Sequence, residues 1–205
     1  MIYNYLPLGD SYTIGEGAKP EEAWPNILVN NLNNNNIEIN LLGNPSVTGW
    51  TSQQLIDNEL PIFDEKKPNF TTILIGVNDW VQEVSKEQFE INLIYILDFV
   101  QERLPDKSKT LTVTIPDFGV TKGGMQYLKG RNSKIGLTEF NDIIKKHSKA
   151  RNLPCIDIMP ISNRMANESD LVAADDLHGS AKMYALWEEL IRPEAIKLLR
   201  EEVRK

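Results

Sequence analysis

Short runs of apolar and β-branched residues alternate with segments of helical periodicity along the whole chain. The runs are Ile2–Leu8, Ile37–Leu42, Phe70–Ile75, Thr110–Ile115 and Pro154–Ile158. Most are continuous rather than alternating, which is typical of strands buried on both faces of a parallel sheet. Strands that alternate with helices predict right-handed βαβ units. We therefore expect an α/β fold, a three-layer α/β/α sandwich around one parallel sheet.

Helical spacing of apolar residues is clearest in four segments, namely Trp24–Leu32, Phe89–Leu104, Phe140–His147 and the segment that begins near Ser180. Pro193 lies inside the last of these and predicts a kink or a restart of the helix. Two connections are long, Pro116–Gly136 and Pro160–Ala174. Both would leave the carboxyl ends of strands, where ligands bind in open α/β sheets, so we expect them to be functional.

Composition limits the class of protein. A length of 205 residues with 41% hydrophobic residues fits one domain, residues 1–205, with a sizeable core. The net charge of −7 and the lack of a basic cluster argue against nucleic-acid binding and favour a small-molecule partner. The lone Cys155 excludes an internal disulfide and a thiolate zinc site.

The ends and the apolar runs of the sequence bear on localisation. The segment Met1–Leu8 lacks the pattern of a signal peptide, and no apolar run approaches the length of a membrane span. We expect a cytoplasmic protein with no integral membrane association. The oligomeric state is not encoded in any pattern of the sequence.

Polar groups follow the predicted strands at the points where the strands end. These groups are Gly9-Asp10-Ser11, Asn44–Gly49, Gly76-Val77-Asn78-Asp79 and, before the last helix, Asp175-Asp176-Leu177-His178. The carboxyl ends of parallel strands meet at one edge of a sheet. We therefore expect these four groups to lie close together.

The four groups contain every part of a serine-nucleophile site. A serine hydroxyl needs a base, a group that orients the base, and donors for the oxyanion. Ser11 would attack, His178 would take its proton, and Asp175 would accept the imidazole Nδ1–H. The backbone N–H groups of Ser11 and Gly49, together with the side-chain amide of Asn78, would stabilise the oxyanion.

These segments resemble the blocks of the SGNH hydrolases, also called GDSL esterases and lipases. GDSY at 9–12, NPSVTGWTS at 44–52, GVND at 76–79 and DDLH at 175–178 resemble the first, second, third and fifth blocks, in family order. The resemblance implies a flavodoxin-like sheet of five parallel strands and ester hydrolysis without a metal or other cofactor. It also implies the site residues, with Ser11 as nucleophile, Gly49 and Asn78 as oxyanion donors, and Asp175 with His178 completing the triad.

Three positions depart from the family pattern. Tyr12 replaces the Leu of the named motif, Trp50 stands where an Asp frequently follows the oxyanion Gly, and Gly179 stands where a Pro often follows the His. None of these changes removes a catalytic atom. Trp50 alters the hydrogen bonding expected around Gly49 and offers an apolar wall to a substrate.

Structural roles compete with catalytic ones at several polar positions. Ser is a preferred N-cap and Asn a preferred turn residue, so Ser11 and Asn78 taken singly predict local structure. We expect Asp10 and Asp79 to bond nearby backbone amides. His147 follows an apolar helix face and is expected to be a partly buried, non-catalytic histidine.

Two other functional classes stay open. A metal-dependent phosphoesterase would use Asp10, Asn78, Asp79, Asp175 and His178, although two histidines in the whole chain are few for a two-metal site. A non-catalytic flavodoxin-like module would keep the fold without reactivity at the serine.

The residues around the site suggest which esters would bind. Trp50, Trp80 and Tyr127 are expected to border the substrate, and the loop Pro116–Gly136 would contribute to the same pocket. No exposed apolar lid helix is evident. The sequence therefore favours a small-molecule ester with a short acyl chain or an O-acetyl group.

Overall fold

Five parallel strands form one sheet in the order β2-β1-β3-β4-β5. The structure, a computed structural model, describes residues 1–200. The strands are β1 Tyr3–Gly9, β2 Ile39–Leu41, β3 Phe70–Leu74, β4 Thr110–Val113 and β5 Cys155–Ile156. Each overlaps one of the predicted runs, so the α/β prediction is confirmed. The order 2-1-3-4-5 is that of flavodoxin-like sheets.

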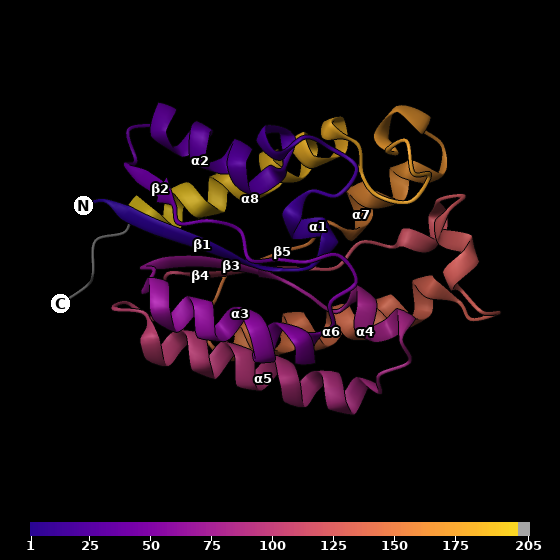
Figure 1. Cartoon of the computed structure of the whole chain (residues 1–205), viewed down its shortest axis with the longest axis horizontal. Coiled ribbons are helices and arrows are strands. Elements are labelled where there is room, and N and C mark those ends of the chain that lie inside the picture. The colour runs from indigo at the N-terminus through magenta and orange to yellow at the C-terminus, as the bar shows by residue number, and fades with distance from the viewer. Residues whose placement is uncertain (201–205) are drawn as a thin grey trace.

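Helices cover both faces of the sheet (Figure 1). They are α1 Ser11–Ile14, α2 Trp24–Asn34, α3 Ser52–Lys66, α4 Val77–Val81, α5 Lys86–Arg103, α6 Ser133–Ala150, α7 Met159–Ser162 and α8 Ala181–Arg200. In Figure 1, α2 and α8 lie above the sheet, and α3, α5 and α6 lie below it. The two long connections contain short 3₁₀ helices, at Phe118–Val120, Gly124–Tyr127, Asn163–Ala166 and Ser169–Leu171.

Helix α3 was not predicted from the sequence. Its apolar buried side chains are few, namely Leu55, Leu60 and Phe63, and Pro61 lies within it. The helix is specified instead at its start, where Thr51 caps the first turn in a reciprocal capping box. Burial of the apolar side chains against the sheet outweighs the local cost of the proline.

Helix α8 runs without a restart through Pro193. Trp187 and Ile191 before the proline, and Ala195 and Leu198 after it, are all buried. This continuous apolar face packs on α2 and favours one helix despite the lost backbone hydrogen bond. Within residues 1–200, no helix is long and apolar enough to cross a membrane.

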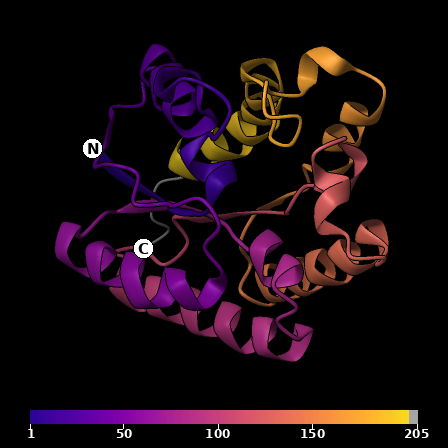
Figure 2. The same cartoon turned by 45° about the vertical axis from the view of Figure 1, so that its right-hand side comes forward.

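The carboxyl ends of the strands meet at the edge that holds α1 and α4, on the right of Figure 1 and turned forward in Figure 2. In the sheet, β2 lies beside one edge of β1, and β3 lies beside the opposite edge of β1. The chain therefore reverses its direction of winding after β2. The crevice at this change of direction is where α/β sheets of this kind bind ligands. The segment after β1 carries Ser11, and the segment after β3 carries Asn78.

Candidate active site

Ser11 sits on a tight turn between β1 and α1. Asp10 is the N-cap of α1 and accepts the N–H of Tyr12 on Oδ1 at 3.0 Å. A Cβ at Gly9 would lie 2.3 Å from the carbonyl oxygen of Leu74, so only glycine fits where β1 meets β3. The turn therefore holds Ser11 at the carboxyl edge of the sheet, where its side chain is 3% exposed.

Asp175 and His178 form a hydrogen-bonded pair in the loop before α8. Asp175 Oδ2 lies 2.6 Å from His178 Nδ1, while Oδ1 accepts the N–H groups of Leu177 at 2.9 Å and His178 at 3.0 Å. Burial raises the pKa of Asp175, but the hydrogen bonds from His178 and Leu177 outweigh it and leave the pKa below its usual range. An ionised Asp175 holds the imidazole with Nε2 as the free nitrogen.

The loop that carries His178 packs against the segment that carries Ser11. The rings of Tyr12 and His178 lie 5.1 Å apart between centroids. Tyr184 donates from its hydroxyl to the carbonyl oxygen of Glu16 at 2.7 Å, which ties α8 to the same segment. The structure thus places His178 against the residue that follows Ser11, although within residues 1–200 no hydrogen bond joins Ser11 Oγ to His178 Nε2. Such bonds are often long before substrate binds.

The segments that carry Gly49 and Asn78 are hydrogen-bonded to each other, and Asn78 is also bonded to the residue before Ser11. Gly49 has φ of +85° and no atom within 4 Å of where a Cβ would be, so the space beside it is open. In the described part of the chain, the backbone N–H groups of Ser11 and Gly49 donate to no protein group. The Asn78 amide donates to the carbonyl of Trp50 at 3.0 Å and to Asp10 Oδ2 at 3.2 Å.

Hydrogen bonds of polar side chains hold the segment around Gly49, and Gln82 is one that sequence reasoning did not identify. Gln82 donates from Nε2 to the carbonyl oxygen of Gly49 at 2.9 Å. Thr48 donates to the carboxylate of Glu16 at 2.5 Å. Asn44, inside the second motif, donates to the carbonyl of Thr13 at 2.9 Å. The two partners in each of these hydrogen bonds lie far apart in the sequence, so no local sequence pattern predicts the contact.

Asp79 and His147 have structural partners, although the backbone amide that Asp79 accepts belongs to Ser52, far away in the sequence, and not to a local residue as expected. Asp79 accepts the N–H of Ser52 at 2.8 Å and also the hydroxyl of Ser52, and burial raises its pKa. His147 lies on α6, where Nε2 is 2.6 Å from a carboxylate oxygen of Glu90. Asp79 lies near Asp10 of the nucleophile turn, but its hydrogen bonds go to Ser52.

The aromatic residues predicted to border the substrate lie in different environments. Tyr127 is 46% exposed and Trp50 is half-buried. Trp80 is buried, at 7% exposed, and the guanidinium of Arg131 lies 3.8 Å from the centre of its ring. The long loop also reaches the base side of the site, where Gly123 N–H donates to the carbonyl oxygen of Asp176 at 2.7 Å.

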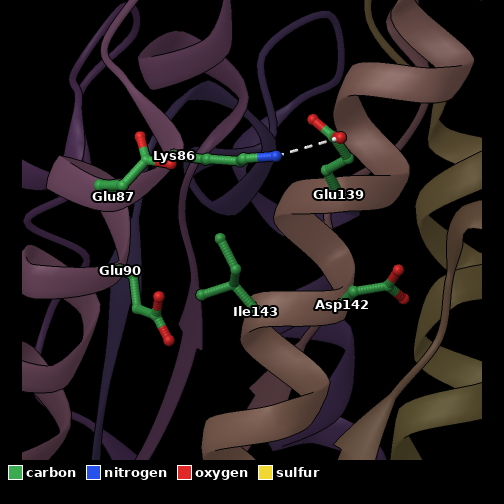
Figure 3. A pocket seen from close by; sticks show the side chains of 6 residues that line it. All are labelled: Lys86, Glu87, Glu90, Glu139, Asp142 and Ile143. Carbon is green, nitrogen blue, oxygen red and sulfur yellow. Dashed lines mark hydrogen bonds and ion pairs between the residues drawn. The ribbon is translucent and has the colours of Figure 1, made fainter.

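A separate pocket of about 290 Å³ lies between α5 and α6 (Figure 3). Its lining residues are Lys86, Glu87, Glu90, Glu139, Asp142 and Ile143. Lys86 pairs with Glu139 at 3.2 Å, and Glu90 pairs with Lys146 at 2.7 Å. The pocket belongs to the helical layer and contains none of the residues predicted to react.

The sequence of this chain is similar to those of known esterases and lipases. The sequence model of the GDSL-like lipase/acylhydrolase family matches residues 8–186. A multidomain esterase of Ruminococcus flavefaciens is 29% identical over 128 residues, which is 60% of this chain. The match spans 16% of the length of that esterase.

Three solved structures share the fold. An esterase from Pseudoalteromonas sp. has a TM-score of 0.73 at 22% identity and covers 97% of this chain and 100% of its own. A lipase/acylhydrolase from Enterococcus faecalis has a TM-score of 0.76 at 20% identity, with 96% of each chain covered. An acetylxylan esterase from Geobacillus stearothermophilus has a TM-score of 0.71 at 18% identity, with 98% of this chain and 95% of its own covered.

Proposed function

The chain belongs to the GDSL-like lipase/acylhydrolase family, and on that premise we propose that it hydrolyses carboxylic esters through a Ser11-His178-Asp175 triad. One observation carries the proposal. The Asp175 carboxylate bonds Nδ1 of His178 at 2.6 Å, and the imidazole packs on Tyr12, the residue next to Ser11. This arrangement leaves Nε2 of His178 free to accept the proton of the serine hydroxyl.

In the acylation step, Ser11 Oγ attacks the carbonyl carbon of the ester while His178 Nε2 accepts the hydroxyl proton. The negative charge that develops on the carbonyl oxygen is stabilised by hydrogen bonds from the N–H groups of Ser11 and Gly49. Within residues 1–200 these two N–H groups have no other acceptor. His178 then gives its proton to the leaving alcohol, and the acyl group remains on Ser11.

In the deacylation step, water attacks the acyl group and His178 takes a proton from it. The tetrahedral intermediate collapses, the carboxylic acid leaves, and Ser11 recovers its proton from His178. Asp175 stays ionised throughout and stabilises the imidazolium in both steps.

Asn78 would be the third oxyanion donor. Both hydrogens of its amide are engaged, one by Trp50 and one by Asp10. The oxyanion would therefore share or replace one of these acceptors. The bond to Asp10, at 3.2 Å, is the longer of the two and the easier to give up.

The substrate would be a small-molecule ester with a short acyl chain or an O-acetyl group. Trp50 and Tyr127 present partly exposed aromatic surface beside the site, and Trp80 would support that surface from beneath Arg131. Aromatic faces of this kind suit sugar rings as well as alkyl groups. The likeness in fold to an acetylxylan esterase is compatible with an acetylated carbohydrate.

A metal-dependent phosphoesterase is less well supported. Both carboxyl oxygens of Asp10 already accept hydrogen bonds, from Tyr12 and Asn78. Both oxygens of Asp175 are likewise engaged, by Leu177 and His178. Within residues 1–200 no group of at least three His, Cys, Asp or Glu side chains is arranged to hold a metal ion.

Hydrolysis of p-nitrophenyl esters from acetate to palmitate tests the proposal. We expect turnover that is highest for acetate or butyrate, is unchanged by EDTA, and is lost in Ser11→Ala. Turnover lost with EDTA would support the phosphoesterase alternative. Full turnover in Ser11→Ala would show that the assignment of the nucleophile is wrong.

A further inference from the structure

A buried glutamate lies directly behind the nucleophile turn. Glu59, on α3, is fully buried. Its Oε2 accepts the backbone N–H of Gly9 at 3.0 Å, and its Oε1 has no partner among the described residues. Gly9 precedes Ser11 by two residues. The contact therefore joins α3 to the turn that carries the proposed nucleophile.

The sheet explains why Gly9 needs this acceptor. On the side of β1 that faces β2, Tyr5 accepts a hydrogen bond from Leu42 N–H at 2.9 Å. Pro7, the next residue on that side, has no N–H, and β2 has already ended. The N–H of Gly9 lies beyond the reach of β2, and Glu59 supplies the acceptor that the sheet does not. An unpaired buried N–H would destabilise the folded turn.

The surroundings of Glu59 and of the neighbouring Asp10 contain acidic and aromatic groups. Asp10 faces Asp79 from α4 and Glu59 from α3, while Tyr12 from α1 and Tyr184 from α8 lie close to it. Within residues 1–200 no Lys or Arg pairs with either carboxyl group.

Asp175 and His178 complete these surroundings beyond the ring of Tyr12. Burial raises the pKa of Glu59 well above its usual range. Burial thus favours the protonated form of Glu59, and a neutral acid accepts the Gly9 N–H without placing a buried charge beside Asp10.

We propose that Glu59 is a positioning residue, which fixes the Gly9-Asp10-Ser11 turn relative to the oxyanion donors by accepting the Gly9 N–H. The proposal rests on the proposed function, because it assigns Glu59 a role only through Ser11. Glu59 does not touch the substrate. Its loss changes where Ser11 Oγ stands rather than how the ester binds, so kcat should fall while KM stays.

Substitutions at Glu59 test this role with p-nitrophenyl acetate as substrate. Glu59→Gln keeps an oxygen that accepts the Gly9 N–H, and we expect its kcat within about threefold of wild type. Glu59→Leu and Glu59→Met fill the space without an acceptor. We expect either to lower kcat roughly tenfold or more, with KM within about twofold, because small misplacements of reacting groups are costly.

Glu188 provides the matched control. It is a buried glutamate on α8, 1% exposed, whose Oε1 also lacks a partner in the described part of the chain. Glu188→Leu should change the melting temperature and leave kcat unchanged.

The outcomes separate this inference from the proposed function. Wild-type kcat in Glu59→Leu or Glu59→Met overturns it, and so does a tenfold loss in a folded Glu59→Gln or an equal loss in Glu188→Leu. If neither apolar variant folds, the Glu59→Gln result decides. Equal turnover by wild type and Ser11→Ala, measured alongside, would instead contradict the proposed function.

Discussion

Two carboxyl groups flank the proposed nucleophile, and their environments are opposite. Asp175 has a side chain that is 39% exposed, and it accepts hydrogen bonds from two backbone N–H groups and from His178. Asp10 is fully buried beside Asp79. The pKa of Asp175 lies below its usual range, whereas burial raises the pKa of Asp10 to about 7.

The difference shows that the surroundings of a carboxyl group, and not its residue type, determine its protonation state and therefore its role. A carboxylate that is supplied with N–H donors stays ionised and can stabilise an imidazolium. A carboxyl group that is buried among other acids keeps its proton and serves as a neutral acceptor. Asp175 therefore acts as an ion, whereas Asp10, below about pH 7, is a neutral acid that links Tyr12 to Asn78.

The largest effect is expected from Asp175→Asn. An amide at this position removes the charge that stabilises the imidazolium of His178 and favours the wrong tautomer, so kcat should fall by about 10⁴-fold. Ester hydrolysis under saturating substrate measures it. Asp176→Asn, which changes the exposed neighbour paired with Lys122 at 3.5 Å, is the control and should match wild type. Similar kcat values for the two variants would mean that Asp175 does not orient the base.

A smaller loss is expected from Asn78→Ala, which removes the link between Asp10 and the Gly49 segment. Loss of one oxyanion donor lowers kcat by roughly 10²–10³-fold. The same variant should react correspondingly more slowly with a phosphonate inhibitor, since both reactions develop charge on an oxygen. A change in KM alone would place Asn78 in substrate binding rather than in the oxyanion hole.

The smallest effect on catalysis, and a distinct effect on stability, is expected from Asp10→Asn. The folded-state pKa of Asp10, about 7, lies above its ordinary value of 3.8. Stability from its neutral form is fully present below the ordinary value and is lost as pH rises through about 7. Asp10→Asn cannot ionise, so this part of the pH dependence should disappear.

Urea unfolding of wild type and Asp10→Asn across this pH range measures the difference in the free energy of unfolding. The variant should lose kcat by only a few-fold, because an amide resembles a neutral acid. Parallel pH dependences of stability in the two proteins would show that Asp10 is ionised in the folded state, and the contrast with Asp175 would fail.

Much of the fold follows from the sequence, because strands buried on both faces leave continuous apolar runs. The first and last residues of each strand were predicted less accurately from the sequence. The run Ile37–Leu42 became a strand of three residues, Ile39–Leu41, since neighbouring strands decide where pairing ends. Helix α3 was missed because few apolar residues mark it and its sequence contains a proline, which argues against a helix.

The residues of the proposed site could be predicted from the sequence to the extent that they follow strand ends. Ser11, Asn78 and Gly49 lie in motifs whose placement the parallel sheet dictates. Glu59 and Gln82 were missed because their roles depend on tertiary contacts, one to Gly9 and one to Gly49, that no periodicity reveals. Burial of Glu59 could be inferred only once α3 had been recognised.

The central claim is that Ser11 is the nucleophile and that His178 activates it. Incubation with an alkyl fluorophosphonate, followed by mass spectrometry of the digested protein, tests this claim most directly. We expect one adduct per chain on Ser11, no adduct in Ser11→Ala, and slow labelling in His178→Ala. An adduct on another residue, or labelling of Ser11 that is as fast without His178 as with it, would contradict the account.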